Sequence, residues 1–362
     1  MQPIKVRKAQ RIAARLCCGL NSGGRELRET MDKSREGISL HFNESFDKHQ
    51  PIYDEISFED LKDVDYIQSG NFAHVYSATF RGQKVAVKVA RDDGNPESSS
   101  RQLENELVML SKIKHENIIN IIGFGKTTES NVVNNNGKKF LVLEFLKHGT
   151  LEQQLLLWAK RQGLLRGKLG VEIPLLCRIQ YILQLAKALN YLHEGIGGEE
   201  NMIIHRDLKP QNIGFSAKGS LKLFDFGLAR TLPFGNTDPE KGYQMTGQTG
   251  TPRYMPPEVA LKLPYNEKAD TYSFALLAWQ LLTCKTPYQA VTLSQFENEI
   301  INKQTRPPCK ESWPVDLVLL LEAAWHPDYW LRPTFSLIVK NLEKIIKDLS
   351  VKEGRTERRR KH

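Results

Sequence analysis

The order of strand-like and helix-like segments constrains the fold of this chain more than any other feature. Residues 52–145 contain short runs of β-branched and aromatic residues that turn signals divide, which is typical of strands. From Thr150 onward apolar residues recur at helical spacing, and the apolar run Ala269–Leu282 predicts a buried helix. A strand-rich part followed by a helix-rich part predicts an α+β fold with two lobes. A cleft between such lobes is a natural ligand site.

Five strands and one helix are predicted in the first part. The strands fall at Tyr66–Ile67, Val75–Ala78, Lys84–Val89, Ile118–Phe124 and Phe140–Leu143. The helix is indicated by apolar residues at helical spacing, namely Leu103, Leu107, Leu110 and Ile113. The polar run Arg91–Ser100 is predicted to be a loop, and Asn134–Gly137 an exposed hairpin insert. In the second part further helices are predicted over Leu175–Leu192, Val315–Trp325 and Thr334–Leu349.

The charge and the cysteine content exclude several classes of protein. Much of the net charge of +9 lies at the two ends of the 362-residue chain, so no nucleic-acid-binding face is needed to explain it. The five cysteines show no C-x-x-C spacing, which argues against a zinc site or a disulfide framework. No apolar run approaches the ~20 residues of a transmembrane helix. We therefore expect a cytoplasmic protein without a nucleic-acid partner.

The two ends are predicted to be basic extensions, residues 1–50 and 350–362. Three interpretations of residues 1–50 stay open. They form a solvated tail, an organelle-targeting peptide, or a membrane-surface helix within residues 1–20 that is acylated at Cys17 or Cys18.

One polar loop between apolar flanks carries the strongest chemical signal, Ile203–Asn212. Asp207 can accept a proton from a hydroxyl nucleophile, and Lys209 can neutralise charge on a transferring phosphoryl group. Asn212 offers a hard oxygen of the kind that Mg²⁺ prefers. By itself this pattern also fits an ordinary polar turn after a helix, so its meaning depends on the rest of the chain.

Further pieces of a phosphoryl-transfer site lie on both sides of this loop in the chain. Upstream, Gly70 lies in a strand–turn–strand flap that can approach phosphates, and Lys88 follows on a mostly apolar strand. A buried lysine needs a partner, for which Glu106 is preferred over Glu104. Downstream, Asp225 ends an apolar strand and is followed by a glycine, a good position for a metal-binding carboxylate.

Residues that follow Gly227 complete the series. The loop between Gly227 and Gly250 is polar and threonine-rich, which suits a change between disordered and ordered states on phosphorylation. Asp270 begins the predicted buried helix, where it can anchor the catalytic loop. Arg332 is predicted to pair bidentately with Glu258.

Taken together and in this order, these residues resemble the protein kinase catalytic domain over about Ile56–Leu349. The resemblance implies an N-lobe of about residues 56–145 and a C-lobe of about residues 150–349. The segments Tyr272–Phe274, Trp325–Pro327 and Arg332–Phe335 are similar to those of the tyrosine-kinase-like branch, whose members mostly phosphorylate Ser and Thr.

The resemblance also implies a role for each site residue. ATP and Mg²⁺ are the expected cofactors, with Mn²⁺ as an alternative ion, and the other partners are protein substrates. Lys88, paired with Glu106, holds ATP. Asp207 is the catalytic base, Lys209 stabilises the γ-phosphoryl group, and Asn212 and Asp225 bind the metal. Leu143 is the gatekeeper. The remaining nucleotide contacts come from the flap, the neighbouring strand and the hinge: Gly70, Val75, Ala86, Glu144, Phe145 and Leu146.

The sequence departs from the family pattern at the nucleotide site. Gln68 and Ala73 replace two flap glycines, and Gly214 stands where a bulky residue usually lies beneath adenine. Pro256 replaces an alanine, which should have a mild effect. The altered flap and Gly214 motivate an alternative function, a nucleotide-binding pseudokinase or scaffold with little turnover.

Arg206, beside Asp207, implies control by phosphorylation of the following loop, because its fixed charge can pair with a phosphate. Thr246 and Thr249 are the expected targets of an upstream kinase, Thr237 is a further candidate, and Tyr243 is a weaker one. Thr251 is expected to contact Asp207 and Lys209 instead.

Overall fold

The computed structural model describes residues 38–39, 53–70, 72–91, 96–127, 138–164, 173–195, 201–234 and 242–360. The predicted hairpin insert, Thr237 and nearly all of the extension 1–50 lie outside these residues. The chain divides into two compact units. The described residues within Asn43–Glu172 and Lys187–Phe234 form one unit, and those within Met1–Phe42, Ile173–Ala186 and Gly235–His362 form the other.

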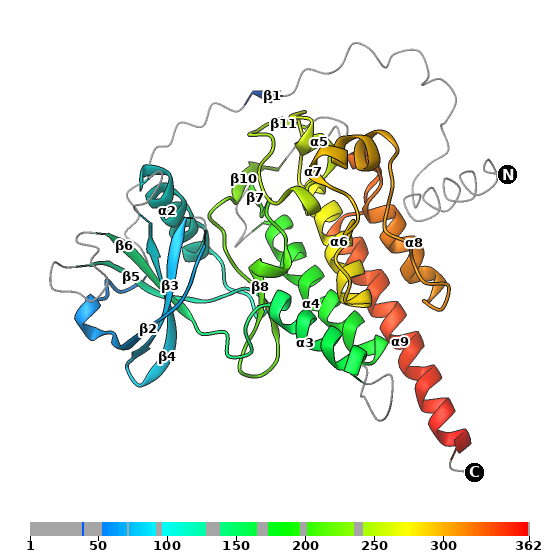
Figure 1. Cartoon of the computed structure of the whole chain (residues 1–362), viewed down its shortest axis with the longest axis horizontal. Helices are drawn as coiled ribbons and strands as arrows, with labels where there is room; N and C mark the ends of the chain where they lie inside the picture. Colours follow the sequence, from blue (N-terminus) through cyan, green and yellow to red (C-terminus); the bar gives the residue numbers. More distant parts are fainter. Residues whose placement is uncertain are drawn as a thin grey trace. The chain divides into compact units, whose positions relative to one another are not determined.

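The first unit is built on a five-stranded antiparallel sheet in the order β2-β3-β4-β6-β5 (Figure 1). The strands are β2 (Lys62–Ser69), β3 (Ala73–Phe80), β4 (Gln83–Ala90), β5 (Ile121–Lys126) and β6 (Lys139–Glu144). Arg81 and Gly82 form the β3–β4 turn, both with positive φ. The five predicted strands are confirmed, except that Ile118 makes only an isolated bridge and β5 begins at Ile121.

One face of this sheet carries a hydrophobic cluster of the unit. Phe58, from the short 3-10 helix η1 (Phe58–Asp60), meets Phe140 edge to face at 5.5 Å between ring centroids. Val85, Val87 and Val89 of β4 are fully buried in this cluster. Because side chains alternate along a strand, Lys88 points to the opposite face of the sheet.

Helix α2 (Pro96–Lys112) contacts β4, β5 and β6. The predicted loop Arg91–Ser100 is therefore wrong over residues 96–100, which belong to the helix. Pro96 takes the first helical position, where its missing N–H costs no bond, and Glu97 lies in the first turn, where the helix dipole favours an acid.

Short elements follow in the same unit and place the polar loop. They are α3 (Leu151–Leu164), β7 (Asn201–Ile204), the 3-10 helix η2 (Pro210–Asn212), β8 (Ile213–Phe215), β9 (Leu221–Leu223) and β10 (Arg230–Pro233). β7 pairs with β10, and β8 pairs with β9, both antiparallel. The loop 205–209 thus runs from a paired strand into a helical turn.

The second unit is mainly helical. Its elements include α5 (Pro257–Ala260), α6 (Lys268–Thr283), α7 (Leu293–Phe296), the π-helix η4 (Glu297–Asn302), α8 (Val315–Ala324), α9 (Phe335–Arg360) and the 3-10 helices η3 (Pro252–Tyr254) and η5 (Tyr329–Leu331). The two-residue strands β1 (Ile38–Ser39) and β11 (Tyr243–Gln244) pair with each other. Helix α4 (Leu175–His193) belongs partly to each unit.

Helix α6 is the centre of this second unit. Every one of its residues is buried, as the apolar run in the sequence predicts, and it contacts α8, η3 and η5. Helix α9, which packs against α8, continues to Arg360 and so passes beyond the predicted boundary at residue 349 (Figure 1). No helix in the described part of the chain is long and apolar enough to cross a membrane. The strand-rich first part of the chain and the helix-rich second part confirm the predicted α+β fold.

Candidate functional site

Lys88, Glu106 and Asp225 form a charged cluster in the first unit. The Lys88 ammonium lies 2.5 Å from Glu106 Oε2 and 2.7 Å from Asp225 Oδ1. The preference for Glu106 as the partner is confirmed, because Glu104 pairs with Lys139 instead. Strand β4, helix α2 and the segment after β9 each supply one member, so residues 137 positions apart in the chain meet here.

The pKa values of the cluster members shift in different directions. Burial raises the pKa of the Glu106 carboxyl above its ordinary value of 4.5, although the Lys88 ammonium acts against this. Burial by itself would lower the pKa of the Lys88 ammonium, but Asp225 and Glu106 outweigh it and raise that pKa above its ordinary value. Burial would likewise raise the pKa of Asp225, but the Lys88 ammonium holds the pKa of this carboxyl below its ordinary value of 3.8. At neutral pH Asp225 is therefore an ionised oxygen ligand.

The predicted catalytic loop brings its three polar residues together. Lys209 Nζ lies 2.6 Å from Asp207 Oδ2, and Asn212 Nδ2 donates to the same oxygen at 3.0 Å. Asn212 Nδ2 also donates to the Asp207 carbonyl at 2.9 Å. Asp207 and Asn212 are buried, so the position of the carboxylate is well determined by its neighbours.

His205 links this loop to the segment that carries Asp225. It is fully buried, its ring meets that of Phe226 edge to face at 5.0 Å, and its Nε2 lies 3.1 Å from the Phe224 carbonyl. The Phe224 N–H in turn donates to the Asn212 carbonyl at 3.0 Å. The backbones that carry Asn212 and Asp225 are thus hydrogen-bonded neighbours.

Two residues of the site have left-handed backbone conformations. Arg206 has φ of 66° and Asp225 has φ of 67°, values that cost energy for any residue other than glycine. Arg206 Nε donates to the Leu228 carbonyl at 2.7 Å, which ties the loop to the turn after Asp225. Strain of this kind is concentrated at functional sites in proteins.

The residues predicted to bind adenine line the end of β6 and its neighbours. Leu143 pairs with Ala86 across the sheet, and Val75 pairs with Lys88. Glu144 Oε2 accepts hydrogen bonds from the backbone and side chain of Asn120, each at 3.1 Å, and from Lys222 Nζ at 2.9 Å. Lys222 was missed in the sequence, although a lysine between Leu221 and Leu223 is the same signal that identified Lys88.

Hydrogen bonds connect the described residues of the flap, in which Gln68 and Ala73 replace two glycines. Gly70 N donates to the Ala73 carbonyl at 2.8 Å, and Arg91 Nη1 donates to the Gly70 carbonyl at 2.7 Å. Ser69 Oγ accepts from the Tyr66 hydroxyl at 2.9 Å and lies 2.6 Å from His74 Nδ1. These contacts connect the described residues of β2 and β3 on the two sides of the turn.

The volume that a side chain at position 214 would occupy is filled by other groups. A Cβ atom at Gly214 would lie 2.5 Å from Leu146 Cδ1, 3.1 Å from the Gly149 carbonyl and 3.3 Å from Phe224 Cε1. Leu146 and Phe224 therefore pack into the space that a larger residue at this position would need.

A divalent cation fits this donor set. Mg²⁺ takes hard oxygen ligands, commonly one or two protein groups plus phosphate oxygens and water. The ionised Asp225 and the amide of Asn212 meet that description. In the part of the chain that the structure describes, no group of three or more His, Cys, Asp or Glu side chains can hold a metal. A metal whose coordination is completed by phosphate oxygens does not need such a group of three side chains.

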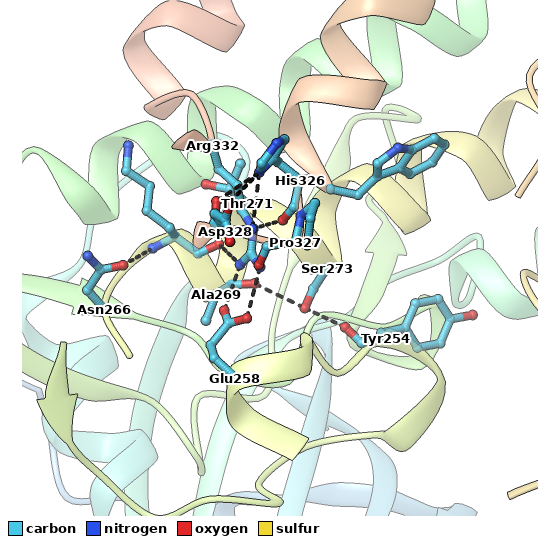
Figure 2. A network of polar contacts seen from close by, with 12 residues as sticks. Tyr254, Glu258, Asn266, Ala269, Thr271, Ser273, His326, Pro327, Asp328 and Arg332 are labelled. Carbon is cyan, nitrogen blue, oxygen red and sulfur yellow. Dashed lines mark hydrogen bonds and ion pairs between the residues drawn. The ribbon is translucent and has the colours of Figure 1, made fainter. Parts of the chain in front are cut away.

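Arg332 and Glu258 form a buried ion pair in the other unit (Figure 2). Arg332 Nη1 and Nη2 lie 2.6 and 2.8 Å from the two carboxylate oxygens of Glu258, as predicted. The remaining N–H groups donate to the carbonyls of His326, Lys268 and Pro327. The Tyr272 ring also lies 5.0 Å from the guanidinium carbon. This arrangement anchors the segment around α5 to the start of α6.

The predicted phosphorylation sites lie before this anchor. Thr249 Oγ1 and the Tyr265 hydroxyl both donate to the Thr246 carbonyl, at 2.9 and 3.1 Å. Asp270 is buried in the first turn of α6. Its proposed link to the catalytic loop and the contact proposed for Thr251 stay predictions.

Comparison with known proteins agrees with this geometry. Residues 61–342 match the family model described as protein tyrosine and serine/threonine kinase. The chain is 31% identical over 295 residues to serine/threonine-protein kinase STY46 of Arabidopsis thaliana, covering 82% of this chain and 46% of the relative. It is 32% identical over 299 residues to dual specificity protein kinase shkE of Dictyostelium discoideum, covering 82% of this chain and 38% of the relative. The chain thus spans less than half the length of these relatives.

Proposed function

This chain belongs to the protein tyrosine and serine/threonine kinase family, and we propose that it transfers the γ-phosphoryl group of Mg-ATP to Ser and Thr hydroxyls of protein substrates. The observation that carries the proposal is the grouping of the charged residues in one compact unit. Lys88 contacts Glu106 and Asp225, and Asp207 is held by Lys209 and Asn212.

Each residue has a distinct task in this reaction. Asp207 accepts the proton of the substrate hydroxyl, and its fixed carboxylate orients that hydroxyl towards phosphorus. Lys209 and Lys88 neutralise charge on the phosphate oxygens. Asp225 and Asn212 would hold the divalent cation, which supplies charge neutralisation at the phosphates when bound.

Lys209 supports Ser and Thr as acceptors over Tyr. It stands two residues after Asp207, as in Ser/Thr kinases, whereas tyrosine kinases usually lack a lysine there, and its ammonium contacts the Asp207 carboxylate. The relatives differ in this respect, because one is named a serine/threonine kinase and another a dual specificity kinase. Acceptor choice therefore needs a direct measurement.

The test is a [γ-³²P]ATP assay on a generic basic protein, followed by phosphoamino acid analysis. We expect phosphoserine and phosphothreonine, and a fall of about 100- to 10 000-fold in rate for Asp207→Asn, since the general base is lost. Asp54→Asn, at an exposed carboxylate of the same unit, is the matched control and should behave as wild type. Incorporation that persists in Asp207→Asn would overturn the proposal and favour a pseudokinase.

We further propose that phosphorylation of Thr246 or Thr249 by an upstream kinase raises activity through the charge of Arg206. The proposal rests on the place of Arg206 beside the catalytic base and on the polar loop that follows. Phosphatase treatment should lower the rate of wild type and leave a Thr246→Ala/Thr249→Ala double variant unchanged. Equal turnover of treated and untreated wild type would refute it.

A further inference from the structure

Asn105 lies on helix α2, directly before Glu106, and its side chain contacts the turn that follows Asp225. Its Nδ2 lies 3.1 Å from each of three carbonyl oxygens, those of Phe226, Gly227 and Ala229. A carboxamide has only two N–H groups, so three carbonyls share them.

The turn has a shape that needs such a donor. Asp225 enters it with φ of 67°, and the Ala229 N–H closes it by donating to the Phe226 carbonyl at 3.0 Å. The helix is packed closely against it, because a Cβ atom at Gly227 would lie 3.3 Å from Gln102 Oε1. Buried carbonyls that lost their donor would carry an unsatisfied hydrogen-bond cost.

Helix α2 therefore reaches Asp225 by two routes. Glu106 contacts Lys88, and Lys88 contacts the Asp225 carboxylate. Asn105, one residue earlier, holds the backbone immediately after Asp225. The first route sets the position of the carboxylate oxygen, and the second sets the direction of the backbone that carries it.

We propose that Asn105 is a positioning residue, which orients the Asp225 carboxylate for the divalent cation and makes that orientation depend on the position of helix α2. This inference rests on the proposed function of the site as a Mg-ATP site. Asn105 does not touch nucleotide or metal in this account. Its loss should weaken the use of Mg²⁺ more than the affinity for nucleotide itself.

The test compares Asn105→Leu with Glu104→Gln. Leucine has a similar volume but no N–H group, whereas Glu104 is the neighbouring residue on the same helix and pairs with Lys139 outside the site. Binding of a fluorescent ATP analogue is titrated with free Mg²⁺ and repeated in EDTA. We expect Asn105→Leu to raise the half-saturating Mg²⁺ concentration about tenfold, as for the loss of one good hydrogen bond. Glu104→Gln should stay within twofold of wild type.

Two results would overturn the inference. One is an unchanged Mg²⁺ dependence in a folded Asn105→Leu protein. The other is an equal loss of nucleotide binding with Mg²⁺ and in EDTA, which would show a general structural role. If Asn105→Leu fails to fold, Asn105→Ser keeps a donor and is measured in the same way, with a smaller shift expected and the same two refuting results. Because binding needs no turnover, an inactive wild type would refute the proposed function while leaving this test intact.

Discussion

Two buried charge clusters of this protein differ in how their charges are balanced. In the Arg332–Glu258 pair, one cation meets one anion, and all five N–H groups of the guanidinium have acceptors. In the Lys88–Glu106–Asp225 cluster, one cation meets two carboxylates. The Arg332 side chain is fully buried, whereas that of Asp225 is 36% exposed and its backbone is strained.

This difference separates a structural cluster from a functional one. The first cluster is neutral and has no unused hydrogen-bonding capacity on its cation, so it can only hold α5 and α6 together. The second places two carboxyl groups around one cation, and one of them, that of Asp225, is partly open to solvent. A partly exposed carboxylate beside a lysine suits a site that takes up a divalent cation together with anionic phosphates.

The largest effect is expected for Asp225→Asn. This change removes the negative charge of Asp225 and leaves Glu106 as the acidic partner of Lys88, so the protein should still fold, with only a small loss of stability. The reaction should lose several kcal/mol of charge stabilisation, which corresponds to a fall of about 1000-fold in kcat. Initial rates and thermal melting measured on the same preparation check both statements. Activity within tenfold of wild type would contradict the functional role of the Lys88–Glu106–Asp225 cluster.

For Arg332→Ala we expect the reverse pattern, a loss of about 3–5 kcal/mol of unfolding free energy, because Glu258 is left as an unpaired buried charge. Urea denaturation gives this value directly. Lys344→Ala is the control, since the Lys344–Asp316 pair is exposed on both sides, and it should cause no measurable loss. If both variants have the same stability, the Arg332 pair does not have the structural role assigned here.

Glu106→Gln should have an intermediate effect on activity. Lys88 keeps Asp225 as its partner, so the ammonium stays in the site, but helix α2 loses a charge-assisted contact of about 1.5–3 kcal/mol. We expect kcat to fall by about 10- to 100-fold. The expected order of activity is wild type, Glu106→Gln, then Asp225→Asn. If Glu106→Gln had a lower activity than Asp225→Asn, the two carboxylates would not have the separate roles described.

The smallest effect concerns the dependence of stability on pH. The pKa of Asp225 is lowered in the folded protein by Lys88, after burial has acted in the opposite direction, so its contribution to stability is present above its ordinary pKa of 3.8. That contribution is lost as the pH falls through the lower, folded value. The difference in melting temperature between wild type and Asp225→Asn should therefore shrink as the pH is lowered below 4. A melting-temperature difference that grows at acid pH would mean that folding raises the pKa of Asp225 instead of lowering it.

Sequence patterns were sufficient where a charged residue interrupts an apolar segment. Lys88 lies in such a strand, and the need for a counter-ion led to Glu106. Arg332 and Glu258 were predicted to pair because a guanidinium can bind a carboxylate bidentately. Lys222 also interrupts an apolar strand, and its partner Glu144 lies at the end of β6. Asn105 has no comparable signal, because an asparagine on a helix is most often a solvated residue.

By itself the sequence determined the α+β order, the family and the chemical type of each site residue, because residue identity and spacing limit which charges can be buried and which segments can be helical. Only the tertiary structure decided which groups share an atom. Glu106 and Asp225 meet on one lysine, Leu146 and Phe224 fill the space at Gly214, and Asn105 holds the turn after Asp225. Such contacts join positions far apart in the chain, and their geometry depends on how the sheet, helix α2 and the loops pack together.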